Sequence, residues 1–205
     1  LPNLMVFLMH RVYLFRDGID SNNYMLYFYN SSDYKMCISF EHCKFGSRGI
    51  DVDDPEYAGG ALTQSRLKSY VYIYYARMLN IRDCVINYAI TGNSSNGHGI
   101  YCRFPEILHV EDVKVYSPLN NSSYSNYPLC LSENNDDGIE CEIRNISQEL
   151  IFNGTYEYIP SLIRISGYLN ARIHNISVNM PDRGLSEVRP ANLYLQNNLI
   201  YFSYL

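Results

Sequence analysis

Hydrophobic and polar residues alternate along this chain in short runs, and the alternation changes phase at single polar residues. Around Asp83, apolar Leu79 and Ile81 precede the polar residue, and Cys84 and Ile86 follow it. Side chains of a β-strand alternate between two faces, so apolar residues on both sides of one polar residue share a face only if the chain bends there. The pattern predicts a strand, a bend and a second strand with one common buried side.

The same motif occurs seven times, which predicts a repeat architecture. The bend positions are separated by 31, 41, 29, 33, 30 and 22 residues, spacings that suit one coil each, and they are Arg11, His42, Asp83, Asp112, Asn145, Asn175 and Asn197. Five of the seven bends are Asn or Asp, which tolerate the left-handed backbone conformation. We therefore expect an all-β fold, a right-handed parallel β-helix of about seven coils, with the bend side chains stacked in a ladder.

Turns and loops fit this arrangement. Gly-Ile pairs at Gly18, Gly49, Gly99 and Gly138 follow polar turn residues and predict turns that feed further strands. Variable loops are expected at 53–66, 88–98, 116–137 and 149–160, where functional residues would lie. A sandwich or barrel is the alternative for many short strands, but it predicts two-residue hairpin turns that we do not find.

Composition limits the size and the partners of the molecule. The 205 residues are 47% hydrophobic, enough for one core, so we expect a single domain over residues 1–205. The formal net charge is −5, which argues against a nucleic-acid partner. No run of about 18 apolar residues occurs, so we expect no membrane span. The motif is already present at Phe7, so we expect the chain to be a segment of a longer solenoid.

Six cysteines leave two alternatives open. They could form three disulfides of a secreted protein, or several could fill the core as small hydrophobic side chains next to the bends. Their spacing matches no zinc-binding pattern, so we expect no metal and no cofactor. The cysteines are Cys37, Cys43, Cys84, Cys102, Cys130 and Cys141.

The repeat resembles the right-handed parallel β-helix superfold shared by pectate lyases, polygalacturonases, phage tailspikes and many surface adhesins, over roughly residues 7–202. Residues 96–100 are similar to the Gly-His-Gly segment of polygalacturonases, residues 163–165 to their Arg-Ile-Lys segment, and residues 17–20 to their Asn-Thr-Asp-Gly-Ile-Asp segment. Ser166 replaces the Lys of that family, and no Gly-Asp-Asp lies between residues 17 and 98. The resemblance implies a fold and leaves the activity open.

The partial resemblance implies one enzymatic hypothesis. Glycoside hydrolysis requires two carboxyl groups about 5–9.5 Å apart across the scissile bond. The candidate catalytic residues are His98 and Arg164 with acids from Asp17, Asp51, Asp136 and Asp137. The acids near residue 51 could instead hold a calcium ion, as in lyases of this fold, and both acidic clusters also read as turns.

Tyrosines in and near the loops suggest carbohydrate contacts. Of the 21 tyrosines, we expect Tyr116, Tyr124 and Tyr127 to contact a polysaccharide or glycan. From Tyr70 to Tyr75, alternation with apolar residues favours ordinary strand packing.

Acceptor sequons suggest a glycosylated protein. We expect modification in loops, at Asn30, Asn93, Asn120 or Asn121, and Asn153. The sequons at Asn145 and Asn175 occupy bends, so we expect their amides to be buried and unmodified. The sequons favour a secreted protein or one on a cell or virion surface.

Two functional hypotheses follow. The first is a non-catalytic structural or adhesive β-solenoid at the surface, with loops that present tyrosines and glycans. The second is a polysaccharide-acting enzyme with an acidic groove beside His98 and Arg164. Because open solenoid ends leave strand edges unpaired, self-association through the ends is also expected.

Overall fold

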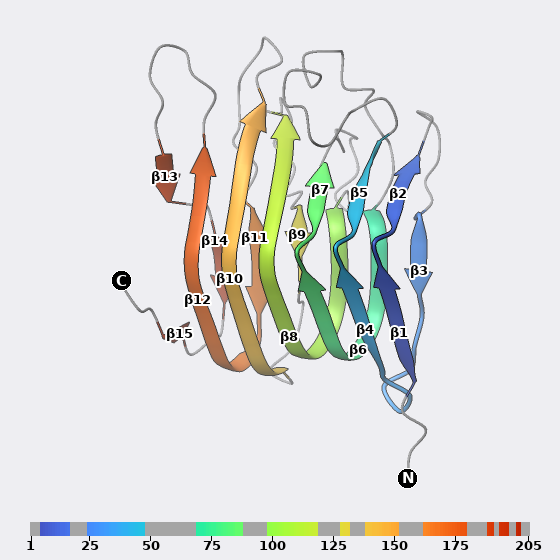
Figure 1. Cartoon of the computed structure of the whole chain (residues 1–205). Coiled ribbons are helices and arrows are strands. Elements are labelled where there is room, and N and C mark those ends of the chain that lie inside the picture. The colour runs from blue at the N-terminus through green and yellow to red at the C-terminus, as the bar shows by residue number, and fades with distance from the viewer. Residues whose placement is uncertain are drawn as a thin grey trace.

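The computed structural model covers the whole chain and describes residues 5–16, 24–47, 69–87, 98–118, 128–131, 138–151, 162–179, 188–190, 193–196 and 200–201. These residues form a β-solenoid of mostly parallel strands without any helix, which confirms the prediction of an all-β parallel solenoid (Figure 1). The right-handed sense of the coils stays a prediction. None of the described segments is a helix of the length and apolarity needed to cross a membrane.

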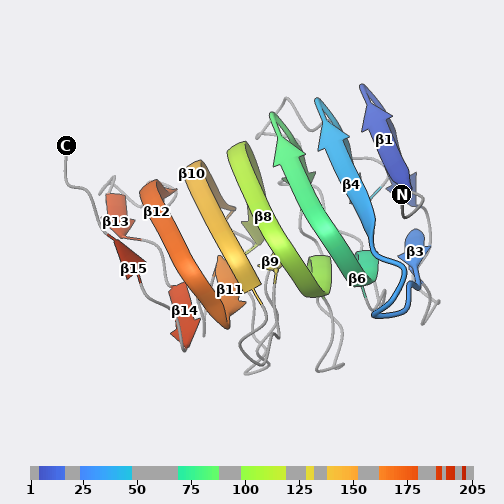
Figure 2. The same cartoon turned by 90° about the horizontal axis from the view of Figure 1, so that it is seen from below.

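Six parallel strands form the front sheet and follow one another in chain order along the solenoid (Figure 2). They pair so that copies of the motif align, as in Phe7 opposite Ile38 and Ile38 opposite Leu79. The strands are β1 (Val6–His10), β4 (Met36–Glu41), β6 (Ser69–Arg82), β8 (His98–Pro118), β10 (Gly138–Ile151) and β12 (Tyr168–Asn179).

Two further sheets complete the coils. The upper sheet follows the bends and contains β2 (Tyr13–Arg16), β5 (Lys44–Ser47), β7 (Val85–Asn87) and the ends of β8, β10 and β12. The rear sheet precedes the front sheet in each coil. It contains β3 (Leu26–Phe28), the starts of β6 and β8, β9 (Leu129–Cys130), β11 (Ile163–Ser166) and β14 (Leu193–Gln196).

Six of the predicted bends adopt the left-handed conformation. Arg11, His42, Asp83, Asp112, Asn145 and Asn175 have φ between 49° and 55°. The predicted side-chain ladder forms at one end, where Asn175 Nδ2 donates to Asn145 Oδ1 at 2.7 Å and Asn145 Nδ2 donates to Asp112 Oδ1 at 2.9 Å. Asn145 and Asn175 are exposed, so the expectation that they are buried was wrong: the bend places apolar residues inward two positions before it and one position after it, and its own side chain points outward.

The predicted inward positions form the core. At most bends the apolar residues before and after the bend are almost fully buried, including Ile38, Phe40, Leu79 and Ile81, which have no exposed surface. At the Arg11 bend, Phe7, Val12 and Leu14 are only partly buried. Deleting such a side chain leaves a cavity that the stacked coils cannot readily close, which makes these rows the main source of stability.

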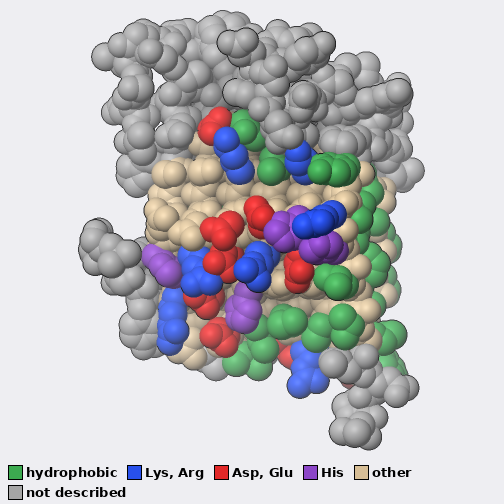
Figure 3. All heavy atoms as spheres, in the orientation of Figure 1, with side chains coloured by type: hydrophobic (Ala, Val, Ile, Leu, Met, Phe, Trp, Pro, Cys, Tyr) green, Lys and Arg blue, Asp and Glu red, His purple; other side chains and the backbone are tan. Residues whose placement is uncertain are grey.

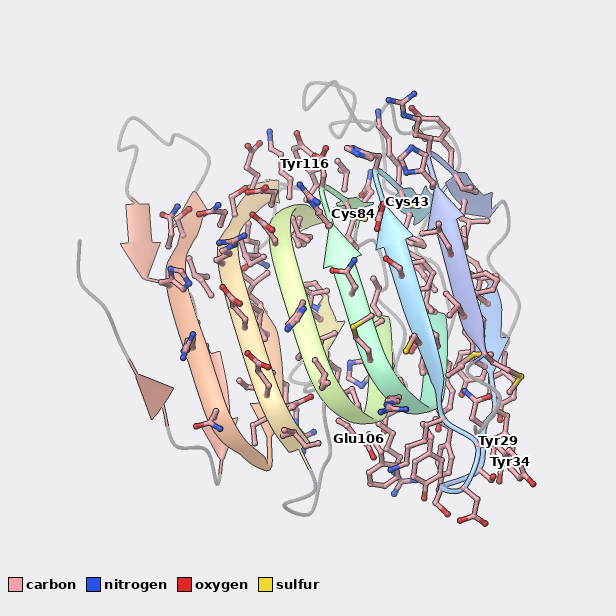
Figure 4. The ribbon with its side chains drawn as sticks, turned by 60° about the horizontal axis from the view of Figure 1, so that its bottom comes forward. Tyr29, Tyr34, Cys43, Cys84, Glu106 and Tyr116 are labelled. Atoms are coloured by element: carbon pink, nitrogen blue, oxygen red, sulfur yellow. The ribbon has the colours of Figure 1, made fainter. Side chains whose placement is uncertain are left out.

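All six cysteines are free thiols, so the structure contains no disulfide among them. Cys43 and Cys84 lie in the slot after the bend on successive coils, as Figure 4 shows, and their thiols donate to the carbonyl oxygens of Met9 and Phe40, both at 3.4 Å. Burial raises the pKa of the Cys84 thiol to about 12. These thiols behave as packing groups.

The expected count of seven coils needs correction. The described residues show six bends. The seventh copy was wrongly placed, because Leu193 and Leu195 pair with Ile163 and Ile165 of the rear sheet, and the front sheet resumes only at Ile200, opposite Ala171. A spacing of 22 residues was too short for a further complete coil, and Asn197 itself lies outside the described residues.

The two ends of the solenoid differ. Within the described residues, β1, β2 and β3 each pair on one side only. At the other end, β13 (Val188–Pro190) pairs antiparallel with the end of β12, and β15 (Ile200–Tyr201) pairs with its middle. Self-association through the ends stays a prediction.

Candidate functional site

Tyrosines form a continuous row on the outer face of the rear sheet. The strand register places Tyr27 of β3 opposite Tyr72 of β6, and Tyr72 opposite Tyr101 of β8. Neighbouring residues of a parallel sheet point the same way, so aromatic residues at one position of successive coils meet. Sequence and register together thus produce the row.

The rings in this row stack on one another. Ring centroids lie 5.2 Å apart for Tyr27 and Tyr72, and 4.9 Å apart for Tyr72 and Tyr101, with interplanar angles of 26° and 22°. Tyr24 contacts both Tyr27 and Tyr72 at 5.3 and 4.7 Å. A second stack joins Tyr29 to Tyr74 at 5.2 Å. We call Tyr24, Tyr27, Tyr29, Tyr72, Tyr74 and Tyr101 the tyrosine ladder.

An arginine braces the second stack. The Arg103 guanidinium carbon lies 5.3 Å from the centroid of Tyr74 and 5.2 Å from that of Phe104, and Arg103 Nη1 donates to the Tyr74 hydroxyl at 3.5 Å. Cations near ring faces are attracted by the ring quadrupole. The ladder is therefore held by ring stacking and by a cation, and both restrict the rotation of the rings.

Burial favours the protonated form of two ladder hydroxyls, those of Tyr72 and Tyr24. Partial burial, followed by the neighbouring Tyr24, raises the pKa of Tyr72 to about 12, although the Arg103 charge opposes this. Burial and Tyr27 also raise the pKa of Tyr24. At neutral pH these two tyrosine side chains are uncharged, and their hydroxyl groups can both donate and accept hydrogen bonds.

The ladder is buried at one end and open at the other. Tyr101 is only 8% exposed, whereas Tyr29 is 67% exposed, and nearby Tyr34 is 72% exposed. Tyr29 and Tyr34 lie together at one corner of the solenoid (Figure 4). Because the inner rings cover one another, open ring surface is found at this end.

The open end is anchored by polar contacts. Lys35 Nζ lies 2.6 Å from Glu106 Oε1, which ties the loop after β3 to the corner of β8. Asn30 Nδ2 donates to the carbonyl oxygen of Tyr75 at 2.8 Å. The loop that carries Tyr29 and Tyr34 is thus fixed to the coils that follow it.

Two of the six candidate catalytic residues are described. His98 begins β8, is 3% exposed, and stacks on Tyr101 with centroids 5.2 Å apart. Arg164 lies on β11 and is aligned with Cys130, which is aligned with Tyr101, so both residues belong to the rear sheet. Asp17, Asp51, Asp136 and Asp137 lie outside the described residues, so the carboxylate pair stays a prediction.

The remaining predicted sites are the tyrosines expected to contact carbohydrate and the asparagines expected to be glycosylated. Tyr116 is only 6% exposed, with Lys114 Nζ 4.8 Å from its ring centroid, so it offers no open ring surface. Tyr124 and Tyr127 lie outside the described residues. Among the predicted acceptor asparagines only Asn30 is described, half-buried, and the others lie outside the described residues, namely Asn93, Asn120, Asn121 and Asn153.

Sequence reasoning missed the exposed end of the ladder. Tyr72 and Tyr101 each lie 11 residues before a bend, so aligning the repeats on their bends would have shown that they meet. Tyr27 lies 15 residues before its bend, because the loop after β3 lengthens that coil, and only the three-dimensional register brings it into the row.

The front sheet carries a different outer surface, a band of charged side chains visible across the strands in Figure 3. Some neighbours in one row lie within ion-pair distance: Arg144 Nη2 lies 2.7 Å from Glu111 Oε1, and His10 Nδ1 lies 3.6 Å from Glu41 Oε2. Beside this row, His109, Glu140 and Glu142 bring possible metal-ligand atoms within 4.8 Å of one another.

Comparison with known proteins found no matching family model, no matching curated protein and no matching solved structure. The resemblance to pectate lyases and polygalacturonases therefore has no support beyond the motif, and the parallel β-solenoid is the level at which the fold is shown.

Proposed function

We propose that this chain forms a right-handed parallel β-helix that acts as a non-catalytic, surface-exposed scaffold and binds carbohydrate through the open end of the tyrosine ladder. The carrying observation is the pair of exposed rings, Tyr29 and Tyr34, at the end of a braced aromatic stack. The proposal includes secretion, or exposure on a cell or virion surface.

The chemistry of the surface favours sugars. A pyranose ring has an apolar C–H face, which packs on an aromatic ring, and peripheral hydroxyls, which pair with tyrosine hydroxyls. Because the Tyr29 ring is already restricted by stacking on Tyr74, binding to it costs little additional side-chain entropy. The formal net charge of −5 disfavours acidic polysaccharides, so the proposed ligand class is neutral polysaccharide.

The burial of His98 supports a non-catalytic role. A general acid or base must reach the glycosidic oxygen or an attacking water. The His98 ring is almost fully buried and stacked on Tyr101, which leaves little of it accessible to a polymer. The enzymatic hypothesis stays a prediction that requires two carboxyl groups about 5–9.5 Å apart beside His98 and Arg164.

Affinity electrophoresis of the full chain tests the proposal. Gels would contain galactomannan, β-1,4-glucan or polygalacturonate, and migration would be compared with a gel without polysaccharide. We expect retardation by at least one neutral polymer, and loss of this retardation in the double variant Tyr29→Ala/Tyr34→Ala. Tyr13→Ala is the control, because Tyr13 is also an exposed tyrosine, at 56%, but lies on the upper sheet.

Three outcomes would overturn the proposal. They are migration unaffected by either neutral polymer, equal retardation of the double variant and the wild type, and release of reducing ends from polygalacturonate. The last result would favour the enzyme, and loss of that activity in His98→Ala with retained circular dichroism would assign it to this chain.

A further inference from the structure

A second constellation lies on the outer face of the front sheet, away from the tyrosine ladder. His109 of β8 is directly opposite Glu142 of β10, and Glu140 precedes Glu142 by two residues, so all three side chains leave the same face of the sheet. Their possible ligand atoms all lie within 4.8 Å of one another. The backbone under these side chains is a continuous part of the parallel ladder.

The imidazole of His109 has an unsatisfied atom. His109 Nε2 is buried from solvent and has no hydrogen-bond partner in the described part of the chain. Buried polar atoms are nearly always paired, and leaving one unpaired is unfavourable because the atom loses its hydrogen bonds to water. A ligand that accepts the nitrogen lone pair would remove this cost.

The two carboxylates lack full charge compensation. Glu140 is aligned with Ile107 on one side and Asn170 on the other, neither of them cationic. The nearest cation to Glu142 is Arg144, whose Nη1 lies 3.8 Å from Glu142 Oε1 while its Nη2 is held by Glu111 at 2.7 Å. A cation placed between Glu140 and Glu142 would be attracted by both.

The remaining neighbours neither complete nor block this set. Cys141, between the two glutamates, points into the core, and burial raises the pKa of its thiol, so it is no ligand. Asn80, on the other side of His109, donates from Nδ2 to Ser39 Oγ at 2.8 Å. Arg172 is aligned with Glu142 but forms no ion pair with it within the described residues.

We propose that His109, Glu140 and Glu142 bind a divalent transition-metal ion, with Zn²⁺ preferred and water completing the coordination. One imidazole nitrogen with two carboxylate oxygens is a donor set that Zn²⁺ accepts, whereas Ca²⁺ and Mg²⁺ prefer oxygen ligands only. Ligand atoms around a tetrahedral zinc ion lie about 3.4 Å apart, so small side-chain rotations on a fixed backbone close the site. Three protein ligands leave one position open to water or to an external ligand.

Metal titration of the full chain tests this site. The protein would be produced without a polyhistidine tag, stripped with a chelating resin, and titrated with Zn²⁺ by calorimetry and with Co²⁺ by visible absorption. We expect one saturable ion per chain, with Co²⁺ bands typical of low coordination number and displaced by Zn²⁺. His109→Ala, Glu140→Gln and Glu142→Gln should each weaken binding by at least about tenfold.

The matched control is His10→Ala on the same face. His10 and Glu41 form a similar neighbouring His–Glu pair without a second glutamate, so this variant should bind as tightly as the wild type. Circular dichroism before titration verifies that each variant is folded. The proposal is overturned if the wild type shows no saturable binding, if folded His109→Ala binds like the wild type, or if His10→Ala loses as much affinity as His109→Ala.

Discussion

The outer face of the rear sheet and the outer face of the front sheet are built on the same strands but use different chemistry. On the rear sheet, β6 and β8 contribute stacked tyrosines, whereas further along the same strands they contribute Arg82 and Glu111 to a charged row. Under both faces the inward rows are mostly apolar and buried. The comparison teaches that the inward rows specify the solenoid, while each outward row is free to carry its own chemistry.

The largest loss of stability is expected from a substitution in the tyrosine ladder of the rear sheet. Tyr72→Ala removes ring contacts with Tyr24, Tyr27 and Tyr101, and should lower the free energy of unfolding by about 2 kcal/mol, because each aromatic pair adds roughly 0.5–1.5 kcal/mol beyond burial. Urea unfolding followed by circular dichroism measures this. Tyr13→Ala should change stability by no more than about 0.5 kcal/mol. Equal effects of the two variants would show that stacking contributes nothing measurable.

A smaller effect is expected where the front and upper sheets meet. Asp112→Val places a β-branched residue at φ 53° and removes the acceptor for Asn145 Nδ2, and should destabilise by about 1–2 kcal/mol. Asp112→Asn keeps both the backbone tolerance and an acceptor, so it should stay close to the wild type in the same urea experiment. If Asp112→Val were as stable as Asp112→Asn, the left-handed backbone at the bend would not be a source of strain.

Alkaline titration tests whether the Tyr72 hydroxyl in the tyrosine ladder is buried. Tyr72 is neutral when protonated, and its pKa is raised from 10.0 to about 12 in the folded chain. The unfolded chain therefore loses this proton at a lower pH than the folded chain. The contribution of Tyr72 to the free energy of unfolding is present below pH 10 and is lost as pH rises from about 10 toward about 12. The difference in ultraviolet tyrosinate absorbance between the wild type and Tyr72→Phe measures the pKa. A midpoint near 10 would contradict the burial of this hydroxyl.

The smallest effect is expected on the charged face. Glu111→Gln removes the partner of Arg144, and the resulting loss of stability should be slight and should vanish at about 1 M NaCl, where the Debye length is about 3 Å. Urea unfolding at low and high salt tests this. By contrast, the Tyr72→Ala effect should persist at high salt. A salt-independent loss in Glu111→Gln would indicate a packing role for Glu111.

Much of the fold could be predicted because the repeated strand-bend-strand motif can be recognised within a short stretch of sequence. The phase change at each bend identified six left-handed residues and most of the core, since a buried row requires apolar residues at fixed distances from the bend. The seventh copy failed because Leu193 and Leu195 have the same alternation as front-sheet residues, and alternation alone does not tell which sheet a strand joins.

The surface sites were less predictable because they depend on register between coils of unequal length. Tyr29 and Tyr34 lie in the coil-specific loop after β3, and within the described residues β3 pairs only with β6. His109 and Glu142 each lie three residues before a bend, so alignment of the repeats would have paired them. The expectation of no metal rested on cysteine spacing alone and did not consider pairing across strands.

The buried thiols have a consequence for the lifetime of the folded chain in an oxidising medium. While the coils stay closed, burial protects the thiols from oxidation, since the reactive thiolate is suppressed at Cys84, Cys102 and Cys141. Once the coils open, six free thiols become available for random disulfide formation, and wrongly linked chains no longer refold. Unfolding would then be irreversible. The lifetime of this protein outside a reducing compartment would be set by the rate at which it unfolds.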